Sequence, residues 1–240
     1  METQVRELKY RMMTVNQLKI AAQTHTYQEL SDTLNFSPPI ISRYIKGHVL
    51  PSLGRSRSIH EKLAEITSPA EALRRRLTLD EEGYFDNTPI VSEITWLKTI
   101  ANHAVERFAG RRVTKVLTAA VDGVPVASLV ANLLGVDLVI AKSTREVGIT
   151  DFAEESFTQG GSAVKRSLYV SKRSIGRRDS FVIIDDVVRT GNMVRALVDL
   201  VTGQRGDIAG VYVIVAVGDQ WRMVLGRIID RYSFDTFIEL

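Results

Sequence analysis

The sequence FVIIDDVVRTGNM occupies residues 181–193 and joins an apolar run to two acids and a glycine-containing loop. The apolar residues predict a buried strand over Phe181–Asp185, with the two acids at its carboxyl end. A short loop, Val187–Gly191, then leads into a predicted helix over Asn192–Thr202. Ligands of parallel α/β sheets bind beyond the carboxyl ends of the strands, and amides at a helix N-terminus suit a phosphate. The stretch therefore predicts a phosphate-binding loop.

The two acids of this stretch require a different partner from the loop. Asp185 and Asp186 would repel a phosphate, but their oxygens can accept hydrogen bonds from the two hydroxyls of a ribose, with or without Mg²⁺ nearby. Thr190 adds a hydroxyl for the phosphate. We expect no catalytic residue, no protein-held metal site and no required cofactor.

Two further segments predict parts of the same site, although each is weak alone. Residues 118–123, TAAVDG, follow one predicted strand and precede a helix. Lys142 follows another strand, where a lone lysine is otherwise an ordinary surface residue. The predicted ligand-binding residues are Asp185, Asp186, Val187, Val188, Arg189, Thr190, Gly191, Asp122, Gly123 and Lys142.

The segments around this stretch alternate between strands and helices. Apolar runs predict strands over Val113–Ala119, Val136–Ala141 and Ile208–Val217, and helical patterns cover Val91–Ala109 and Val124–Leu134. Short apolar strands separated by helices indicate a parallel α/β sheet covered on both faces. The intervening segment Lys142–Ser180 is long and polar, contains Gly160-Gly161, and is expected to act as a lid or binding loop.

The N-terminal part has a different, all-helical pattern. Residues 1–12 are polar and are expected to be frayed or to form an additional helix. Residues 27–46, YQELSDTLNFSPPIISRYIK, fit a helix-turn-helix. Asn35 suits a turn with positive φ, Ser37 can cap the second helix ahead of Pro38, and Gly47 can end it. The residues predicted to pack between the two helices are Leu30, Leu34, Phe36, Ile41 and Tyr44.

The exposed face of the second helix presents Ser42, Arg43 and Lys46. Arg43 could bind a guanine edge or a phosphate, while Lys46 is expected to bind phosphate. Basic residues are concentrated between Lys46 and Arg76, which suits a nucleic acid although the chain has a net charge of only +3. The alternative is an ordinary two-helix hairpin with a solvated face. The predicted DNA-binding residues are Gln28, Ser37, Ser42, Arg43, Lys46, His48 and Arg55.

Composition and length bound the organisation. The 240 residues are 45% hydrophobic and 25% charged and contain no cysteine, which excludes disulfides and thiolate metal sites. No apolar run is long enough for a bilayer and the N-terminus is too polar for a signal peptide, so we expect a cytoplasmic protein with no membrane partner. The expected domains are a helix-turn-helix over 1–67, a connector helix and loop over 68–89 with a helix at Pro69–Leu79, and an α/β domain over 90–240.

The strand, Asp-Asp pair and Thr-Gly loop resemble the phosphoribosyl-pyrophosphate-binding motif of type I phosphoribosyltransferases. The resemblance implies that fold for the sheet domain, preceded by an all-α helix-turn-helix domain. Two positions depart from the motif. Arg189 stands where the family has a small residue, so it could either serve as a cation or close the pocket. Asn192-Met193 replaces the common Gly-Thr/Ser, which removes one phosphate hydroxyl.

Over most of its length the chain resembles the archaeal orotate-phosphoribosyltransferase-like transcriptional regulators, represented by the regulator of glucose and fructose catabolism. The matching stretches are Arg43–Ser52, Val116–Ala127, the region of Lys142, Glu146 and Gly148, Val182–Gly191 and Val213–Asp219. The bacterial phosphoribosyltransferase-type purine repressor is a looser match. The resemblance implies a homodimer that binds double-stranded DNA and takes phosphoribosyl pyrophosphate or a related nucleotide as effector, without turnover.

Two alternatives remain open. The chain could be an active orotate or purine phosphoribosyltransferase with an accessory DNA-binding domain, since transfer needs Mg²⁺ and basic loop residues that the insertion could supply. In the other, the N-terminal helices serve only for dimerisation, which leaves their turn chemistry and clustered basic residues unexplained.

Overall fold

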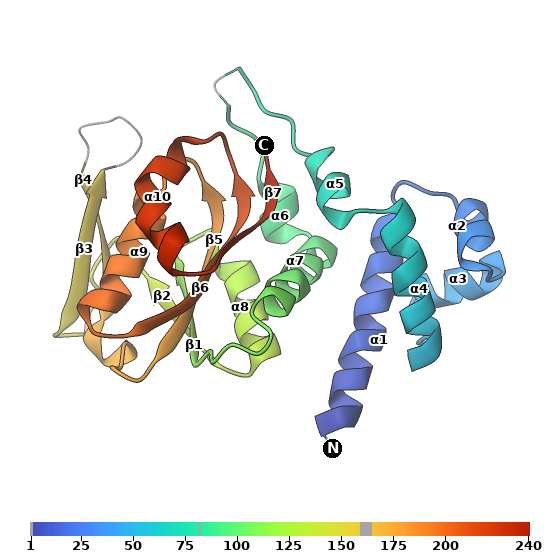
Figure 1. The fold of residues 1–240 in the computed structure, drawn as a ribbon, viewed down its shortest axis with the longest axis horizontal. Helices are drawn as coiled ribbons and strands as arrows, with labels where there is room; N and C mark the ends of the chain where they lie inside the picture. The colour runs from blue at the N-terminus through green and yellow to red at the C-terminus, as the bar shows by residue number, and fades with distance from the viewer. Residues whose placement is uncertain (1, 82, 159–164) are drawn as a thin grey trace. The chain divides into compact units, whose positions relative to one another are not determined.

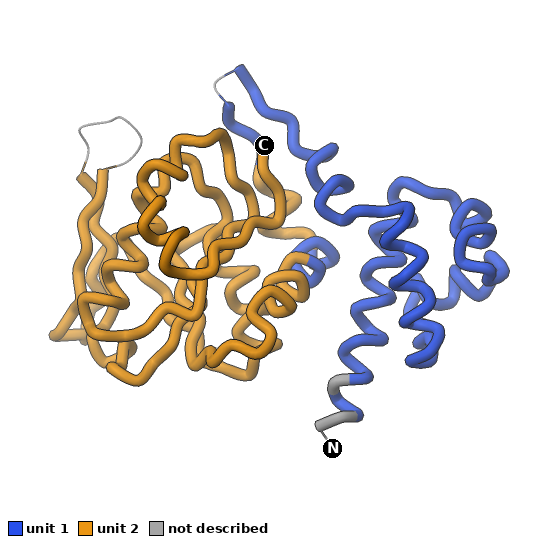
Figure 2. The backbone as a smooth tube through the Cα atoms, viewed as in Figure 1, with its two compact units in different colours: residues 1–86, 94–99 blue, residues 87–93, 100–240 orange. Residues whose placement is uncertain are grey.

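The computed structural model describes residues 2–81, 83–158 and 165–240, so Gly160-Gly161 of the predicted insertion lie outside the described residues. The chain forms two compact units, shown in blue and orange in Figure 2. The first contains residues 1–86 and 94–99, and the second contains residues 87–93 and 100–240.

Helices make up the ordered elements of the first unit (Figure 1). They are α1 (Glu2–Ala21), α2 (Tyr27–Leu34), α3 (Pro38–Ile45), α4 (Leu53–Ile66) and α5 (Pro69–Arg74). Residues 2–12 are thus part of one long helix. Ser68 caps α5 by accepting a hydrogen bond from the Glu71 amide. The predicted helix Pro69–Leu79 is wrong in length, because the chain leaves the helix after Arg74.

The turn between α2 and α3 has the predicted backbone. Asn35 has φ 56°, which ends α2 in the left-handed region, and Pro38 occupies the first turn of α3. The predicted capping by Ser37 is wrong, because its side chain makes no hydrogen bond to α3. The two helices pack through a shared apolar core, as expected. Its buried members are Leu18, Ala21, Leu30, Leu34, Ile41, Tyr44, Ile59 and Leu63, and Phe36 packs against them.

A five-stranded parallel sheet forms the centre of the second unit, in the order β2-β1-β5-β6-β7. Its strands are β1 (Lys115–Ala119), β2 (Asp137–Ala141), β5 (Ser180–Val188), β6 (Asp207–Ala216) and β7 (Phe234–Glu239). The predicted parallel α/β sheet is confirmed. The apolar runs of β5 and β6 are buried on both faces, which explains why they lack polar alternation.

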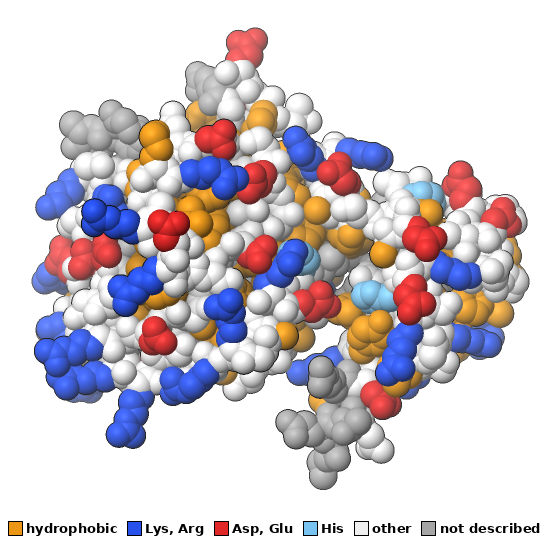
Figure 3. All heavy atoms as spheres, viewed as in Figure 1, with side chains coloured by type: hydrophobic (Ala, Val, Ile, Leu, Met, Phe, Trp, Pro, Cys, Tyr) orange, Lys and Arg blue, Asp and Glu red, His pale blue; other side chains and the backbone are white. Residues whose placement is uncertain are grey.

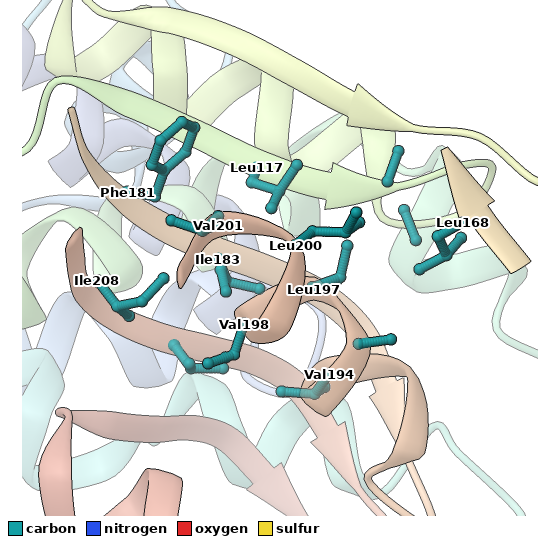
Figure 4. Packing of buried hydrophobic residues seen from close by; sticks show 14 of the residues in the cluster. Leu117, Leu168, Phe181, Ile183, Val194, Leu197, Val198, Leu200, Val201 and Ile208 are labelled. Carbon is teal, nitrogen blue, oxygen red and sulfur yellow. The ribbon is translucent and has the colours of Figure 1, made fainter. Parts of the chain in front are cut away.

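Helices cover both faces of this sheet. They are α6 (Thr88–Ser92), α7 (Ile94–Arg107), α8 (Val124–Leu134), α9 (Asn192–Gly203) and α10 (Gln220–Arg231). Side chains of α9 pack on Leu117, Ile183 and Ile208, as Figure 4 shows. The predicted helix Val91–Ala109 exists as α7 but its predicted start is wrong, because Glu93 adopts an extended conformation and separates α6 from α7.

The insertion between β2 and β5 contains an antiparallel hairpin of β3 (Phe152–Thr158) and β4 (Lys165–Ser171). One isolated bridge between Lys142 and Tyr169 attaches it to the end of β2. In the described ranges, no helix has the length and apolar character needed to cross a bilayer.

Candidate functional site

Strand β5 is longer than predicted, so Asp185 and Asp186 lie within the strand and not at its end. It runs to Val188 and stays paired with β6, with Val187 opposite Val215. Its pairing with β1 ends earlier, at Leu117 and Ile183. The prediction of a loop starting at Val187 is therefore wrong. Val187 and Val188 belong to the strand, because the long neighbour β6 continues to supply hydrogen-bond partners, and the loop is only Arg189–Gly191.

Gly191 joins this loop to helix α9. Its φ is 80°, a left-handed conformation that side chains other than glycine rarely adopt. A Cβ atom added there would also lie 2.8 Å from Cγ of Leu225. The carbonyl of Gly191 accepts the first helical hydrogen bond, from the amide of Arg195. The turn thus leaves the first amides of a 12-residue helix directed at the loop, a position that favours an anion.

Asp185 is a buried carboxylate, with 2% of the residue exposed. Its Oδ2 finds no hydrogen-bond donor among the described residues. Burial raises its pKa well above the ordinary value for an aspartate, and the negative charge of Asp186 raises it further. An unpartnered acceptor of this kind is costly unless a ligand supplies a donor.

Asp186 is half-buried and lies near the side chains of Asp185, Asp122 and Asn87. Burial is the main cause of its raised pKa, and the charge of Asp122 adds to it. The side-chain amide of Asn87 donates to Oδ2 of Asp122 at 3.1 Å and to Oδ2 of Asp186 at 3.4 Å. Asn87 was not predicted as a site residue. It precedes Pro89 in a segment that looks like an ordinary loop, and nothing local to it indicates a partner 99 positions away.

The loop between β1 and α8 lies beside Asp185. A Cβ atom added at Gly123 would overlap the Thr118 hydroxyl and would lie 3.6 Å from Oδ1 of Asp185. The peptide between Ala120 and Val121 is cis, and the side chain of Val121 is exposed. The structure therefore brings Asp122 and Gly123 to the two acids.

Lys142 is engaged elsewhere. Its ammonium group contacts the carboxylate of Glu146, and its backbone exchanges two hydrogen bonds with Tyr169. The half-buried Lys142 is thus positioned by the hairpin, with its charge balanced by a neighbour on the same loop.

The start of α9 is tied to the hairpin. Asn192 donates from Nδ2 to the carbonyl of Thr158 at 3.0 Å. The next residue, Met193, packs on the sheet core, and this accounts for an apolar residue where a hydroxyl was expected from the motif. Arg189 and Thr190 are both half-buried beside this junction.

The predicted DNA-binding side chains lie on α2, α3 and α4 and in the turns that precede and follow α3. Ser37, Arg43, Lys46 and His48 are exposed, and Ser42 is half-buried. Two others have partners within the unit. Gln28 donates to Asp32 at 2.9 Å. Arg55 donates to the Tyr44 hydroxyl at 2.8 Å and lies 5.5 Å above the ring of Phe36.

The second unit is by its geometry a parallel α/β fold in which the buried Asp185 and the half-buried Asp186 lie near the Arg189–Gly191 loop. Residues 88–236 match the family model described as phosphoribosyl transferase domain. The chain belongs to the phosphoribosyltransferase domain family. Adenine phosphoribosyltransferase from Thermoanaerobacter pseudethanolicus shares the fold, with a TM-score of 0.61 at 18% identity over 71% of this chain and 99% of that one.

Curated relatives include both an enzyme and a regulator. A xanthine phosphoribosyltransferase from Alkaliphilus metalliredigens is 30% identical over 132 residues, covering 53% of this chain and 64% of the relative. The probable purine biosynthesis transcriptional regulator PurR from Streptococcus pneumoniae is 30% identical over 150 residues, covering 60% and 54%. The aligned part of this chain spans less than two thirds of either relative's own length.

Proposed function

We propose that the protein is a DNA-binding transcriptional regulator whose phosphoribosyltransferase unit binds phosphoribosyl pyrophosphate or a related nucleotide as effector. The observation that carries the proposal is the α2–α3 pair. It lies outside residues 88–236, the part that matches the family, and exposes Arg43 on its second helix and Lys46 directly after that helix. Similarity to PurR-type regulators supports it. Membership of the archaeal orotate-phosphoribosyltransferase-like regulators is part of the same proposal.

Helix α3 is the element proposed to enter the major groove. Ile41 and Tyr44 of α3 are buried in the core of the unit, so the opposite side, which carries Arg43, faces solvent. A guanidinium can bind both acceptors of a guanine or two phosphate oxygens. Arg55 is proposed to have a supporting role, because its bonds to Tyr44 and Phe36 hold the start of α4 against α3.

The proposed effector site lies at the carboxyl end of β5. The Arg189–Gly191 loop and the start of α9 would hold the 5′-phosphate, and Asp185 and Asp186 would accept hydrogen bonds from ribose hydroxyls. The unpartnered Oδ2 of Asp185 supports this assignment, since a hydroxyl donor would satisfy it.

We propose that the protein has no magnesium site built from its own side chains alone. In the described part of the chain, no three carboxylate or imidazole groups come together in a way that could hold a metal. Mg²⁺ commonly binds through one or two carboxylates together with substrate phosphates. We propose that any Mg²⁺ enters with the pyrophosphate of the ligand and that Asp122 and Asp186 face it.

A second candidate function is phosphoribosyl transfer to a purine or to orotate. The similarity to xanthine phosphoribosyltransferase at 30% identity favours it as much as the similarity to PurR favours regulation. Asn192-Met193 argues against it, because the partly buried Met193 packs against the core where the motif supplies a hydroxyl.

One pair of assays separates the candidates. Labelled genomic fragments are selected for binding to the full chain, and the selected duplex is titrated with and without phosphoribosyl pyrophosphate. In parallel, release of pyrophosphate from phosphoribosyl pyrophosphate is measured with xanthine, adenine, hypoxanthine, guanine or orotate as acceptor. Specific DNA binding that changes with ligand, without turnover, supports the regulator. Turnover without specific DNA binding would show that the protein is an enzyme.

We also propose a homodimer. A single small DNA-binding unit contacts few base pairs, and two copies would bind a two-fold site with half-sites about one helical turn apart. Light scattering at micromolar concentration is expected to give twice the 26.8 kDa chain mass, and the chain mass alone would exclude the dimer.

A further inference from the structure

Several exposed arginines of the phosphoribosyltransferase unit lie in loops that lead into the strands of its sheet. They come from three loops: the one before β1, the one between β4 and β5, and the turn between α9 and β6. We call them the strand-start arginines. They are Arg111, Arg112, Arg173, Arg177, Arg178 and Arg205, and all are exposed.

Hydrogen bonds between the loops show that these segments lie side by side. Arg112 donates to the carbonyl of Arg178 at 2.6 Å, and Lys115 donates to the carbonyl of Ser174 at 2.8 Å. The amide of Asp207 donates to the carbonyl of Asp179 at 2.9 Å. Figure 3 shows Lys and Arg side chains gathered at the lower left of the second unit.

The charges of this surface are predominantly positive, although its third loop also contains the exposed Asp207. Two nearby acids already form ion pairs with lysines, Asp179 with Lys115 and Asp151 with Lys172. Among the described residues, the strand-start arginines form no ion pair. Arg111 and Arg112 each donate to a backbone carbonyl, which leaves most of the five N–H groups of each guanidinium available. Concentrated, unpaired guanidinium groups indicate a polyanionic partner.

This surface is separate from the proposed effector site. Strand β5 begins at the arginines, and Asp185 and Asp186 follow its first residue by five and six positions, which at ~3.3 Å per residue places them ~17–20 Å away. A single nucleotide at the acid pair could not reach the arginines. The partner of this surface is therefore another molecule, or a part of a long one.

The composition of the three loops favours duplex nucleic acid over the alternatives. Residues 111–114, 172–179 and 204–207 contain no aromatic residue on which an unpaired base could stack. They also contribute none of the exposed large hydrophobic side chains that would anchor a protein at a membrane. Arginines without stacking or apolar partners suit the phosphates of a double helix.

We propose that the strand-start arginines bind the phosphate backbone of double-stranded DNA. The surface thus adds sequence-independent contacts to those of α3. This inference rests on the proposed function, because it assumes that the protein binds duplex DNA at all.

The test is the salt dependence of DNA binding by the full chain. Labelled duplexes of increasing length are titrated with the parent and with Arg177→Gln/Arg178→Gln at several salt concentrations. Each lost phosphate contact is expected to reduce the slope of log K against log salt by ~0.9, and affinity at 0.15 M salt by roughly fivefold. The matched control Arg166→Gln/Arg227→Gln removes two exposed arginines elsewhere in the unit and should change neither quantity.

The outcomes separate this inference from the proposed function. If the parent binds its duplex but Arg177→Gln/Arg178→Gln keeps the parental slope and affinity, the inference is overturned and the proposed function stands. If the parent binds no duplex DNA, both fail. Loss of binding to double-stranded RNA or to anionic vesicles, with DNA binding unchanged, would also overturn it. Unchanged melting temperature and phosphoribosyl-pyrophosphate binding would show that the variant is folded.

Discussion

Asn87 donates a hydrogen bond to Asp186 across 99 positions of sequence, at 3.4 Å. The same amide also reaches Asp122, so one neutral side chain stands between two carboxylates, and the charge of Asp122 raises the pKa of Asp186. The hydrogen bond from Asn87 lowers the pKa of Asp186 against the larger effect of burial, which raises it. Asn87 is thus a positioning residue for the acidic edge of the site.

Replacing Asn87 tests this role. Asn87→Ala removes the donor and is expected to lower the free energy of unfolding by ~1 kcal/mol at neutral pH. Asn87→Asp keeps the size but adds a third carboxylate, so it should cost more at pH 7 and much less at pH 4. Urea unfolding at both pH values measures this. Equal losses for the two variants at both pH values would contradict the charge argument.

Asp185 should make stability depend on pH in an unusual direction. Its folded-state pKa is raised, so between the unfolded value near 3.8 and the folded value the native state binds more protons than the unfolded state. Stability contributed by this group therefore falls as pH rises through that window. Asp185→Asn is expected to be more stable than the parent at pH 7, with the difference vanishing near pH 3. In a protein of this size each kcal/mol raises the melting temperature by ~2–4 °C.

The double variant Asp185→Asn/Asp186→Asn tests the proposed effector site. The amide groups present donors where ribose hydroxyls need acceptors, and each lost charge-assisted hydrogen bond costs ~1.5–3 kcal/mol. Affinity for phosphoribosyl pyrophosphate, measured by calorimetry, should fall at least about tenfold. DNA binding without ligand should persist, since neither α3 nor the strand-start arginines include these two acids. An unchanged response to ligand would place the effector site elsewhere.

Gly191 should tolerate no side chain. Gly191→Ala places a Cβ atom against Leu225 in a left-handed conformation, which together cost ~2–4 kcal/mol. We expect a lower melting temperature and weaker phosphate-dependent thermal stabilisation. Gly135→Ala is the matched control, because Gly135 also has positive φ but nothing within 4 Å of an added Cβ atom. Equal effects of the two substitutions would show that contact with Leu225 is unimportant.

Arg43 is expected to dominate specific DNA binding. Arg43→Ala should weaken binding to the selected duplex by ~1–3 kcal/mol and reduce discrimination against unrelated duplexes. Arg57→Ala removes another exposed arginine of the same unit and should have a small effect. Because Arg43 is exposed, the melting temperature should not change. Parental affinity of Arg43→Ala would refute the assignment of α3 as the recognition helix.

Local sequence was sufficient for the elements at the centre of the sheet. Helix α8 has the predicted limits Val124–Leu134, and the predicted strands near β1, β2 and β6 all exist. These elements are buried on the faces of a parallel sheet, so their apolar runs are long and uninterrupted. Asn35 was also predictable, because few residues other than glycine adopt positive φ without strain.

Edge elements were not predictable in the same way. Strand β7, with the sequence FDTFIE, pairs only with β6, and its burial is partial. The β3–β4 hairpin is attached to the sheet by one isolated bridge, and its buried side chains Ala153, Phe157, Leu168 and Val170 reach the core by packing. Such elements depend on a partner already in place, which a local apolar pattern does not reveal.

The acid pair and its loop could be located from residues 181–193 alone, because a buried strand followed by two acids and a glycine leaves few alternatives. Tertiary structure decided how the site works. Pairing with β6 extended β5 to Val188 and shortened the loop. Packing left Oδ2 of the buried Asp185 without a donor among the described residues and placed Asn87 between Asp122 and Asp186. Burial and long-range contacts set the proton affinity of a carboxylate, and neither is encoded in the residues adjacent to it.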